Sequence, residues 1–267
     1  MQLALNFISS ELREAVFVYE ADCLNGRIVN SVVDCPGLSN NLLRLTDDYV
    51  PVLAFWKLTP LSDDLKEACA NGNVQAQDDD GNQNPIFCLA GNYYSLVVYS
   101  LGFNDPGGVG FKGKAGLYRT ALEINDVNAT GYVSPLRGQE LNFRKWPDGS
   151  NPTSFETVAL VDFVDDGSND LDPAAPNNGA SCPENDSFDY QLTPQGDVPR
   201  SFYACVSINR REEDIGTATD TGLYFGNQDV VLYLRGNAAG RSGLMGDNSF
   251  LPTLESRVFV RGAIDRP

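Results

Sequence analysis

Six cysteines fall along this chain of 267 residues as three consecutive pairs of short separation. None lies in a Cys-x-x-Cys motif, so the spacing does not predict a thiolate zinc site or a thioredoxin-like redox site. Nearest-neighbour pairing is expected because each bridge then closes one loop-rich segment; scattered buried thiols are the alternative. Disulfides indicate folding in an oxidising, extracytoplasmic compartment. The expected bridges are Cys23–Cys35, Cys69–Cys88 and Cys182–Cys205.

The negative net charge and the absence of histidine exclude several functions. The chain has 19 Lys and Arg residues against 36 Asp and Glu residues, a net charge of −17, and no histidine. Such an acidic surface repels phosphate groups, so non-specific nucleic-acid binding is not expected. The absence of histidine excludes Ser-His-Asp and Cys-His catalysis and His-containing zinc sites. We expect a protein that is not an enzyme and that holds no cofactor, with calcium as the one candidate.

The first 20 residues carry the strongest helical pattern of the chain. Apolar residues recur there every three or four positions, with polar residues between them. No capping residue marks a start, so this helix is expected to continue upstream of Met1 in the native protein. The residues expected to pack it against a sheet are Leu5, Ile8, Leu12, Val16 and Tyr19.

The remainder of the chain alternates short apolar strands with polar, turn-rich loops. A second, short helix is expected over 62–70, where Ser62 can cap the first turn. The expected fold class is α+β, with an N-terminal amphipathic helix packed on an antiparallel β-sheet and long disulfide-stapled loops. We expect one globular head over 1–267, with the sheet and loops in 50–267. The predicted strands are 52–58, 93–103, 116–124, 158–164, 201–209, 230–236 and 257–262.

Residues 108–115, Gly-Val-Gly-Phe-Lys-Gly-Lys-Ala, nearly match a phosphate-binding loop. Ala115 replaces the Ser or Thr hydroxyl that holds magnesium, and a strand rather than a helix is expected to follow. A glycine-rich hairpin loop is therefore favoured.

Carboxylates crowd the segment 162–172. An EF-hand is excluded because Val164 and Pro173 stand where ligands are required and no helices flank the loop. A solvated acidic loop is favoured, and a calcium ion that relieves the repulsion between these carboxylates is the alternative. The candidate ligands are Asp162, Asp166, Asp170 and Asp172.

A carboxylate-dependent glycoside hydrolase is a remote alternative. Nothing in the sequence singles out two members of the acidic set near the predicted strands, namely Glu123, Glu140, Glu156 and Asp162. Trp146 lies in a polar run and is a candidate contact for a sugar or a partner.

Several short segments resemble one protein family. The run from Leu3 to Tyr19 resembles the segment that directly follows the transmembrane helix in cyanobacterial prepilin-like proteins. Val52-Leu-Ala-Phe-Trp-Lys57 looks like their first strand. These segments are also similar to the pseudopilins of hormogonium polysaccharide secretion. Further segments similar to that group are 94–99, 201–206, 229–237 and 251–258.

The resemblance implies a minor pilin or pseudopilin of a type IV pilus or related secretion filament. In that family an upstream transmembrane helix anchors the subunit in the inner membrane and then packs in the filament core. Residues 1–20 would be the rear half of the long pilin helix, and the head would face the cell exterior. The implied partners are other pilins or pseudopilins and the inner-membrane assembly machinery.

The resemblance does not distinguish between adhesion, motility, DNA uptake and polysaccharide export as the process that the filament supports. A free-standing extracellular module that binds calcium or a glycan is the alternative, with the hydrolase behind it.

Overall fold

The computed structural model describes residues 1–29, 32–38, 48–71, 75–77, 83–85, 91–106, 108–124, 130–137, 140–141, 143–147, 150–167, 180–184, 189–196, 198–208, 227–237 and 253–261. Strands dominate this part of the chain, and its named helices are α1 (Gln2–Leu12), α2 (Ala21–Asn25) and α4 (Asp63–Ala70).

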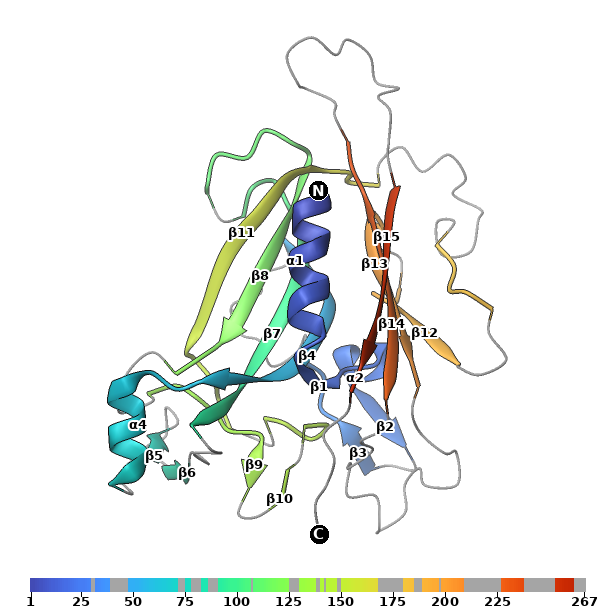
Figure 1. The fold of residues 1–267 in the computed structure, drawn as a ribbon. Helices are drawn as coiled ribbons and strands as arrows, with labels where there is room; N and C mark the ends of the chain where they lie inside the picture. Colours follow the sequence, from blue (N-terminus) through green and yellow to red (C-terminus); the bar gives the residue numbers. More distant parts are fainter. Residues whose placement is uncertain are drawn as a thin grey trace.

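Two antiparallel sheets form the body of the protein (Figure 1). The first sheet has the order β1-β4-β7-β8-β11: β1 (Ala15–Val18), β4 (Tyr49–Pro60), β7 (Asn92–Phe103), β8 (Ala115–Leu122) and β11 (Phe155–Val164). The second has the order β12-β13-β14-β15: β12 (Tyr190–Thr193), β13 (Phe202–Ser207), β14 (Gln228–Arg235) and β15 (Thr253–Val260). Three small sheets of two strands pair β2 (Arg27–Val29) with β3 (Val32–Cys35), β5 (Gln75–Gln77) with β6 (Gln83–Pro85), and β9 (Leu136–Arg137) with β10 (Glu140–Leu141).

The central part of the first sheet is buried on both faces. In β7 all ten residues between the two ends are buried, which is typical of a strand covered on both sides. Successive residues of β4 alternate between two cores: Leu53 and Phe55 face one cluster, whereas Ala54 and Trp56 face the other. This alternation follows from the two-residue period of a strand.

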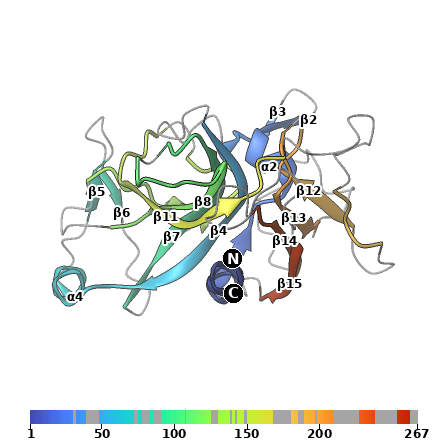
Figure 2. The same cartoon turned by 90° about the horizontal axis from the view of Figure 1, so that it is seen from above.

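One core lies between the two sheets and contains the buried face of α1. It joins side chains of β4, β7 and β8 to the inward residues of β13, β14 and β15. Figure 2 shows α1 nearly end-on between β4 and β15. The other core covers the opposite face of the first sheet and is rich in aromatic rings, among them Trp56, Phe143 and Trp146.

The expected α+β fold class is wrong. The protein is mostly antiparallel β-sheet divided into two sheets, rather than a pilin-like helix on one sheet. The apolar pattern predicts where strands lie but not how they divide into sheets. Strands β12–β15 form a second sheet, which also covers α1.

The expected helix over 1–20 is also too long. It ends at Leu12, and Ala15–Val18 forms strand β1, which pairs with β4 in the register Ala15 with Lys57 and Val18 with Phe55. The run Ala-Val-Phe-Val consists largely of β-branched and aromatic residues, which favour a strand where a sheet edge is open. Tertiary pairing therefore overrides the helical spacing of Val16 and Tyr19.

Other local predictions are confirmed. Each of the seven predicted strands corresponds to a strand of the structure: β4, β7, β8, β11, β13, β14 and β15. The short helix is α4, where the Ser62 hydroxyl accepts a hydrogen bond from the Leu65 amide at 3.3 Å. Lys66 pairs with Asp63 in its first turn at 2.8 Å.

Candidate functional site: the docked first helix and its exposed face

The first helix is held against the body of the protein by one apolar face. Leu5, Ile8 and Leu12 are fully buried in the core between the sheets. Burial of each of these side chains stabilises the fold by roughly 1.5–3 kcal/mol. The Ser9 hydroxyl adds a contact at 2.8 Å to the Ser256 hydroxyl of β15.

A carboxylate near the end of α1 gathers polar side chains from three strands of the first sheet. Glu11 Oε1 lies 2.8 Å from Lys57 Nζ on β4. Arg119 on β8 donates to both carboxylate oxygens, from Nε at 2.9 Å and from Nη2 at 3.0 Å. The Tyr99 hydroxyl on β7 donates to Oε2. We call Glu11, Lys57, Tyr99 and Arg119 the helix clamp.

Electrostatics show that the helix clamp is an ion-pair cluster in its charged form. Burial alone favours the neutral carboxyl, but hydrogen bonds from Arg119, Lys57 and Tyr99 outweigh it and lower the pKa of Glu11 to about 2. Only about 10% of the Glu11 side chain is exposed, against 13% for Lys57 and 16% for Arg119. Removing one partner would leave buried charge without its counterion.

The opposite face of α1 is also partly apolar. Leu3 is 84% exposed and Phe7 46% exposed, and residues four apart lie on the same side of a helix. Gln2 and Asn6 lie beside them and are joined by a hydrogen bond of 3.0 Å. We call Leu3 and Phe7 the exposed pair. Within the described residues α1 therefore has two apolar faces, one docked and one open to solvent.

Two of the residues expected on the helix lie elsewhere. Val16 belongs to β1, and Tyr19 follows it; both pack in the aromatic core on the far face of the first sheet. Tyr19 accepts a hydrogen bond from Trp56 Nε1 at 2.9 Å and donates to the Phe143 carbonyl. The structure thus separates the five expected packing residues into two cores.

Two of the expected disulfides are present. Cys23 is bonded to Cys35, and Cys182 is bonded to Cys205. Cys69 is disulfide-bonded as well, but its expected partner, Cys88, lies outside the described residues. These bridges fit an extracytoplasmic protein.

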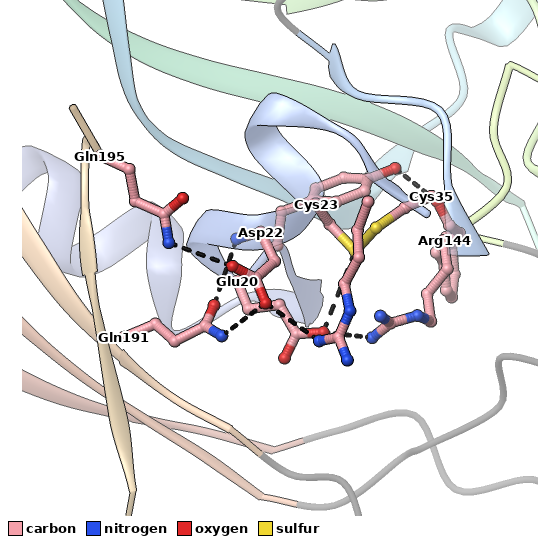
Figure 3. Close-up of a disulfide and its surroundings, with 10 residues drawn as sticks. Glu20, Asp22, Cys23, Cys35, Arg144, Gln191 and Gln195 are labelled. Carbon is pink, nitrogen blue, oxygen red and sulfur yellow. Dashed lines mark hydrogen bonds and ion pairs between the residues drawn. A yellow bond between two sulfur atoms is a disulfide. The ribbon is translucent and has the colours of Figure 1, made fainter. Parts of the chain in front are cut away.

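The Cys23–Cys35 bridge joins α2 to β3, and Gln191 and Gln195 approach Asp22 of α2 from the other side (Figure 3). Asp22 accepts hydrogen bonds from Gln191 Nε2 at 3.0 Å, from Gln195 Nε2 at 3.1 Å and from Arg27 Nη1 at 2.9 Å. Beside it, Glu20 pairs with Arg144. This junction ties the segment after β1 to β12, so it fixes the second sheet relative to the first.

Asp162 and Asp166, the two calcium candidates within the described residues, contact protein groups. Asp162 accepts from the backbone amides of Lys112 at 2.7 Å and Gly113 at 2.8 Å, and Asp166 lies 3.7 Å from Lys114. Asp170 and Asp172 lie outside the described residues. Within the described part of the chain, no cluster of three or more His, Cys, Asp and Glu residues is placed to hold a metal; calcium binding stays a prediction.

Backbone amides of the glycine-rich loop donate hydrogen bonds to carboxylates of the protein itself. Besides Asp162, Asp105 accepts from the amides of Val109 at 3.2 Å and Gly110 at 2.8 Å. Strand β8 follows the loop, as expected. These amides therefore bind side-chain carboxylates at the position where a phosphate-binding loop would present them to a ligand.

Among the described residues, the carboxylates considered for glycoside hydrolysis are not seen as a facing catalytic pair. Glu123 lies 3.2 Å from Arg119, Asp162 binds backbone amides, and Glu156 is exposed on β11. The side chain of Glu140 is outside the described part. Trp146, the candidate contact for a sugar or a partner, lies in a turn but is buried and donates to the Val133 carbonyl at 2.9 Å.

Sequence reasoning missed the helix clamp. A weak signal was present: Glu11 follows Ile8 by three positions and so borders the apolar face of the predicted helix. A charged residue that is buried at such a border requires a partner. The partners themselves could not be found, because Lys57, Tyr99 and Arg119 are between 46 and 108 positions away.

In the described residues no helix is long and apolar enough to cross a bilayer. Comparisons with protein-family models, with curated proteins and with solved structures find no match to this chain.

Proposed function

We propose that this chain is a non-catalytic subunit of a type IV pilus or a related secretion filament, a minor pilin or pseudopilin. The observation that carries the proposal is the pair of apolar faces on α1. One face is fixed to the body by Leu5, Ile8, Leu12 and the helix clamp, while the exposed pair remains open. A filament subunit needs such a helix, because it must be rigid relative to its head and still contact other subunits.

Two further features support the proposal. The segment from Leu3 to Tyr19 resembles the region after the transmembrane helix of prepilin-like proteins, and the disulfides fit a protein exposed outside the cytoplasm. In this proposal the exposed pair contacts helices of neighbouring pilins. An upstream apolar helix anchors the subunit in the inner membrane before assembly, and the protein then reaches the pilus or cell surface.

The test uses the full-length gene and a double substitution, Leu3→Ser with Phe7→Ser. We expect the variant head to keep its thermal midpoint, because both side chains are exposed, while the amount of subunit in sheared surface filaments falls at least about tenfold. The matched control, Gln2→Ser with Asn6→Ser, alters polar neighbours on the same face and should assemble normally.

Absence of the wild-type subunit from the filament fraction would overturn the proposal. Normal assembly of the Leu3→Ser, Phe7→Ser variant would overturn the role of the exposed pair. The sequence of the gene upstream of Met1 tests the anchor separately.

A further inference from the structure

Strand β15 forms one edge of the second sheet, and its backbone can pair with a further strand. It pairs with β14 over eight consecutive residues without a bulge, and within the described residues no strand pairs with its other side. An edge strand presents a row of unpaired N–H and C=O groups, which proteins usually interrupt with a bulge, a proline or a short length. β15 has none of these, whereas the edge strand β11 of the first sheet shifts register twice against β8.

Helix α1 does not cover this edge. The Ser256 side chain is on the core side of β15, where its hydroxyl lies 2.8 Å from that of Ser9, and α1 lies between β15 and β4 (Figure 2). The helix therefore packs on the inner face of the strand rather than along its edge. Leu3 and Phe7 are about 120° and about 160° around the helix from Ser9, so they are directed away from β15.

The side chains of β15 alternate between an apolar inner face and a charged outer face. Leu254 and Val258 pack in the core between the sheets, whereas Glu255 and Arg257 lie on the outer face. Glu255 is exposed, and no ion pair among the described residues involves it. Arg257 is 42% exposed and contacts Asp229 through Nε and Nη2, while Nη1 makes no contact within the described residues. The outer face thus carries one acidic and one basic residue two positions apart.

We propose that two copies of this chain pair through β15 in an antiparallel ladder centred on Ser256. A two-fold axis through Ser256 places Glu255 of each copy opposite Arg257 of the other, and opposite charges in facing positions stabilise a pair of strands. Neighbouring registers are disfavoured. A ladder centred on Glu255 or on Arg257 places two carboxylates or two guanidinium groups directly opposite each other, which is destabilising. The strand is therefore complementary to itself in one register.

The same register covers apolar side chains. On the inner face Leu254 of each copy lies opposite Val258 of the other, which continues the core between the sheets. On the outer face Phe259, 60% exposed in the single chain, lies opposite Thr253. The pairing removes apolar area and unpaired backbone groups from water together.

Sedimentation equilibrium of the 267-residue chain tests the pairing. We expect a reversible dimer, which Glu255→Arg should weaken at least about tenfold because it sets a like charge against Arg257. The control, Glu156→Arg, makes the same reversal at an exposed position of β11 and should dimerise as wild type. A chain that stays monomeric at about 1 mM overturns the proposal. Unchanged association of Glu255→Arg overturns the register.

An exchange of charges sharpens the test. Glu255→Arg presents two basic residues on the edge strand, and Arg257→Glu combined with Asp229→Asn presents two acidic ones without leaving a buried carboxylate unpaired. Each variant should associate weakly with itself, whereas an equimolar mixture should form a heterodimer at least about tenfold more tightly. No gain on mixing overturns the pairing of Glu255 with Arg257.

Cross-linking locates the axis without a change of charge, and it decides if the acidic variant does not fold. In the proposed register two Ser256→Cys residues have Cα atoms about 4.5–5.5 Å apart, within the range of a disulfide. Two Thr253→Cys residues lie about 20 Å apart. Mild oxidation should therefore give covalent dimers of the first variant only. Equal cross-linking of the two variants, or none, overturns the proposal.

This dimer goes beyond the proposed filament role, and the two can fail separately. Leu3→Ser with Phe7→Ser, the assembly variant, should dimerise as wild type, because both side chains are directed away from β15. Loss of the dimer in that variant would contradict the assignment of the interface to β15. If the edge instead binds a strand of another protein, the chain alone stays monomeric and the proposal is overturned.

Discussion

The two sheets each bury a carboxylate that is paired with arginine, but in different surroundings. Glu11 lies between α1 and the first sheet, where its partners Lys57 and Arg119 are themselves mostly buried. Asp229 of β14 is fully buried, yet its partner Arg257 on the edge strand β15 is 42% exposed. Both carboxylates also accept a tyrosine hydroxyl hydrogen bond, from Tyr99 and Tyr190 respectively.

The difference reflects how each sheet is used. The central strands of the first sheet are covered on both faces, so a charge placed between them and α1 must be neutralised mainly by protein groups. The second sheet covers the core with one face only; Phe259 on the other face is 60% exposed, with the Arg257 guanidinium 5.1 Å from its ring centroid. Water therefore shares the solvation of the Arg257–Asp229 pair. We infer that the Glu11–Arg119 pair holds α1 in place. The Asp229–Arg257 pair contributes only a smaller stabilisation at the edge of the second sheet.

The largest effect is expected for Glu11→Ala. This substitution leaves Lys57 and Arg119 without their buried counterion and should lower the free energy of unfolding by about 4 kcal/mol. Urea denaturation of the head measures it. Glu14→Ala is the control, because Glu14 also contacts Lys57, at 3.2 Å, but its side chain is 60% exposed; a loss of less than about 1 kcal/mol is expected there. Equal losses in the two variants would contradict the clamp.

Acid should weaken the helix clamp in a defined pH window. The pKa of Glu11 falls from 4.5 to about 2 on folding, so its stabilising contribution, on the order of 3 kcal/mol, is fully present above about pH 4.5. It is lost as the pH falls toward 2. In Glu11→Gln this component is absent, and the stability difference between wild type and variant should therefore shrink between about pH 6 and pH 2.5. A difference that stays constant would show that Glu11 is not ion-paired.

The smallest of these effects is expected at the second sheet. Asp229→Asn keeps an oxygen acceptor for Arg257 and Tyr190 and should cost about 1.5 kcal/mol, within the usual range for a charged hydrogen bond. Because Arg257 reaches solvent, that cost should decrease in 1 M salt, where the screening length is about 3 Å. The cost of Glu11→Gln should change much less. A larger loss for Asp229→Asn than for Glu11→Gln would reverse our comparison of the two sheets.

Local sequence signals determined much of this protein. The position of α4 follows from its Ser62 cap and its Asp63–Lys66 pair, and the seven longer strands follow from apolar runs bounded by turn residues. Short separation likewise indicated the bridges Cys23–Cys35 and Cys182–Cys205. Each of these signals depends on residues close together in the chain, where backbone geometry links pattern to structure.

The tertiary structure decided the rest. Whether Ala15–Val18 extends the helix or pairs with β4 depends on an edge that is built more than 30 residues later in the chain. The division of the strands into two sheets and the helix clamp likewise combine groups that are distant in sequence. Hydrophobic patterning specifies which residues are buried but not against which partner, since burial of apolar area is non-directional.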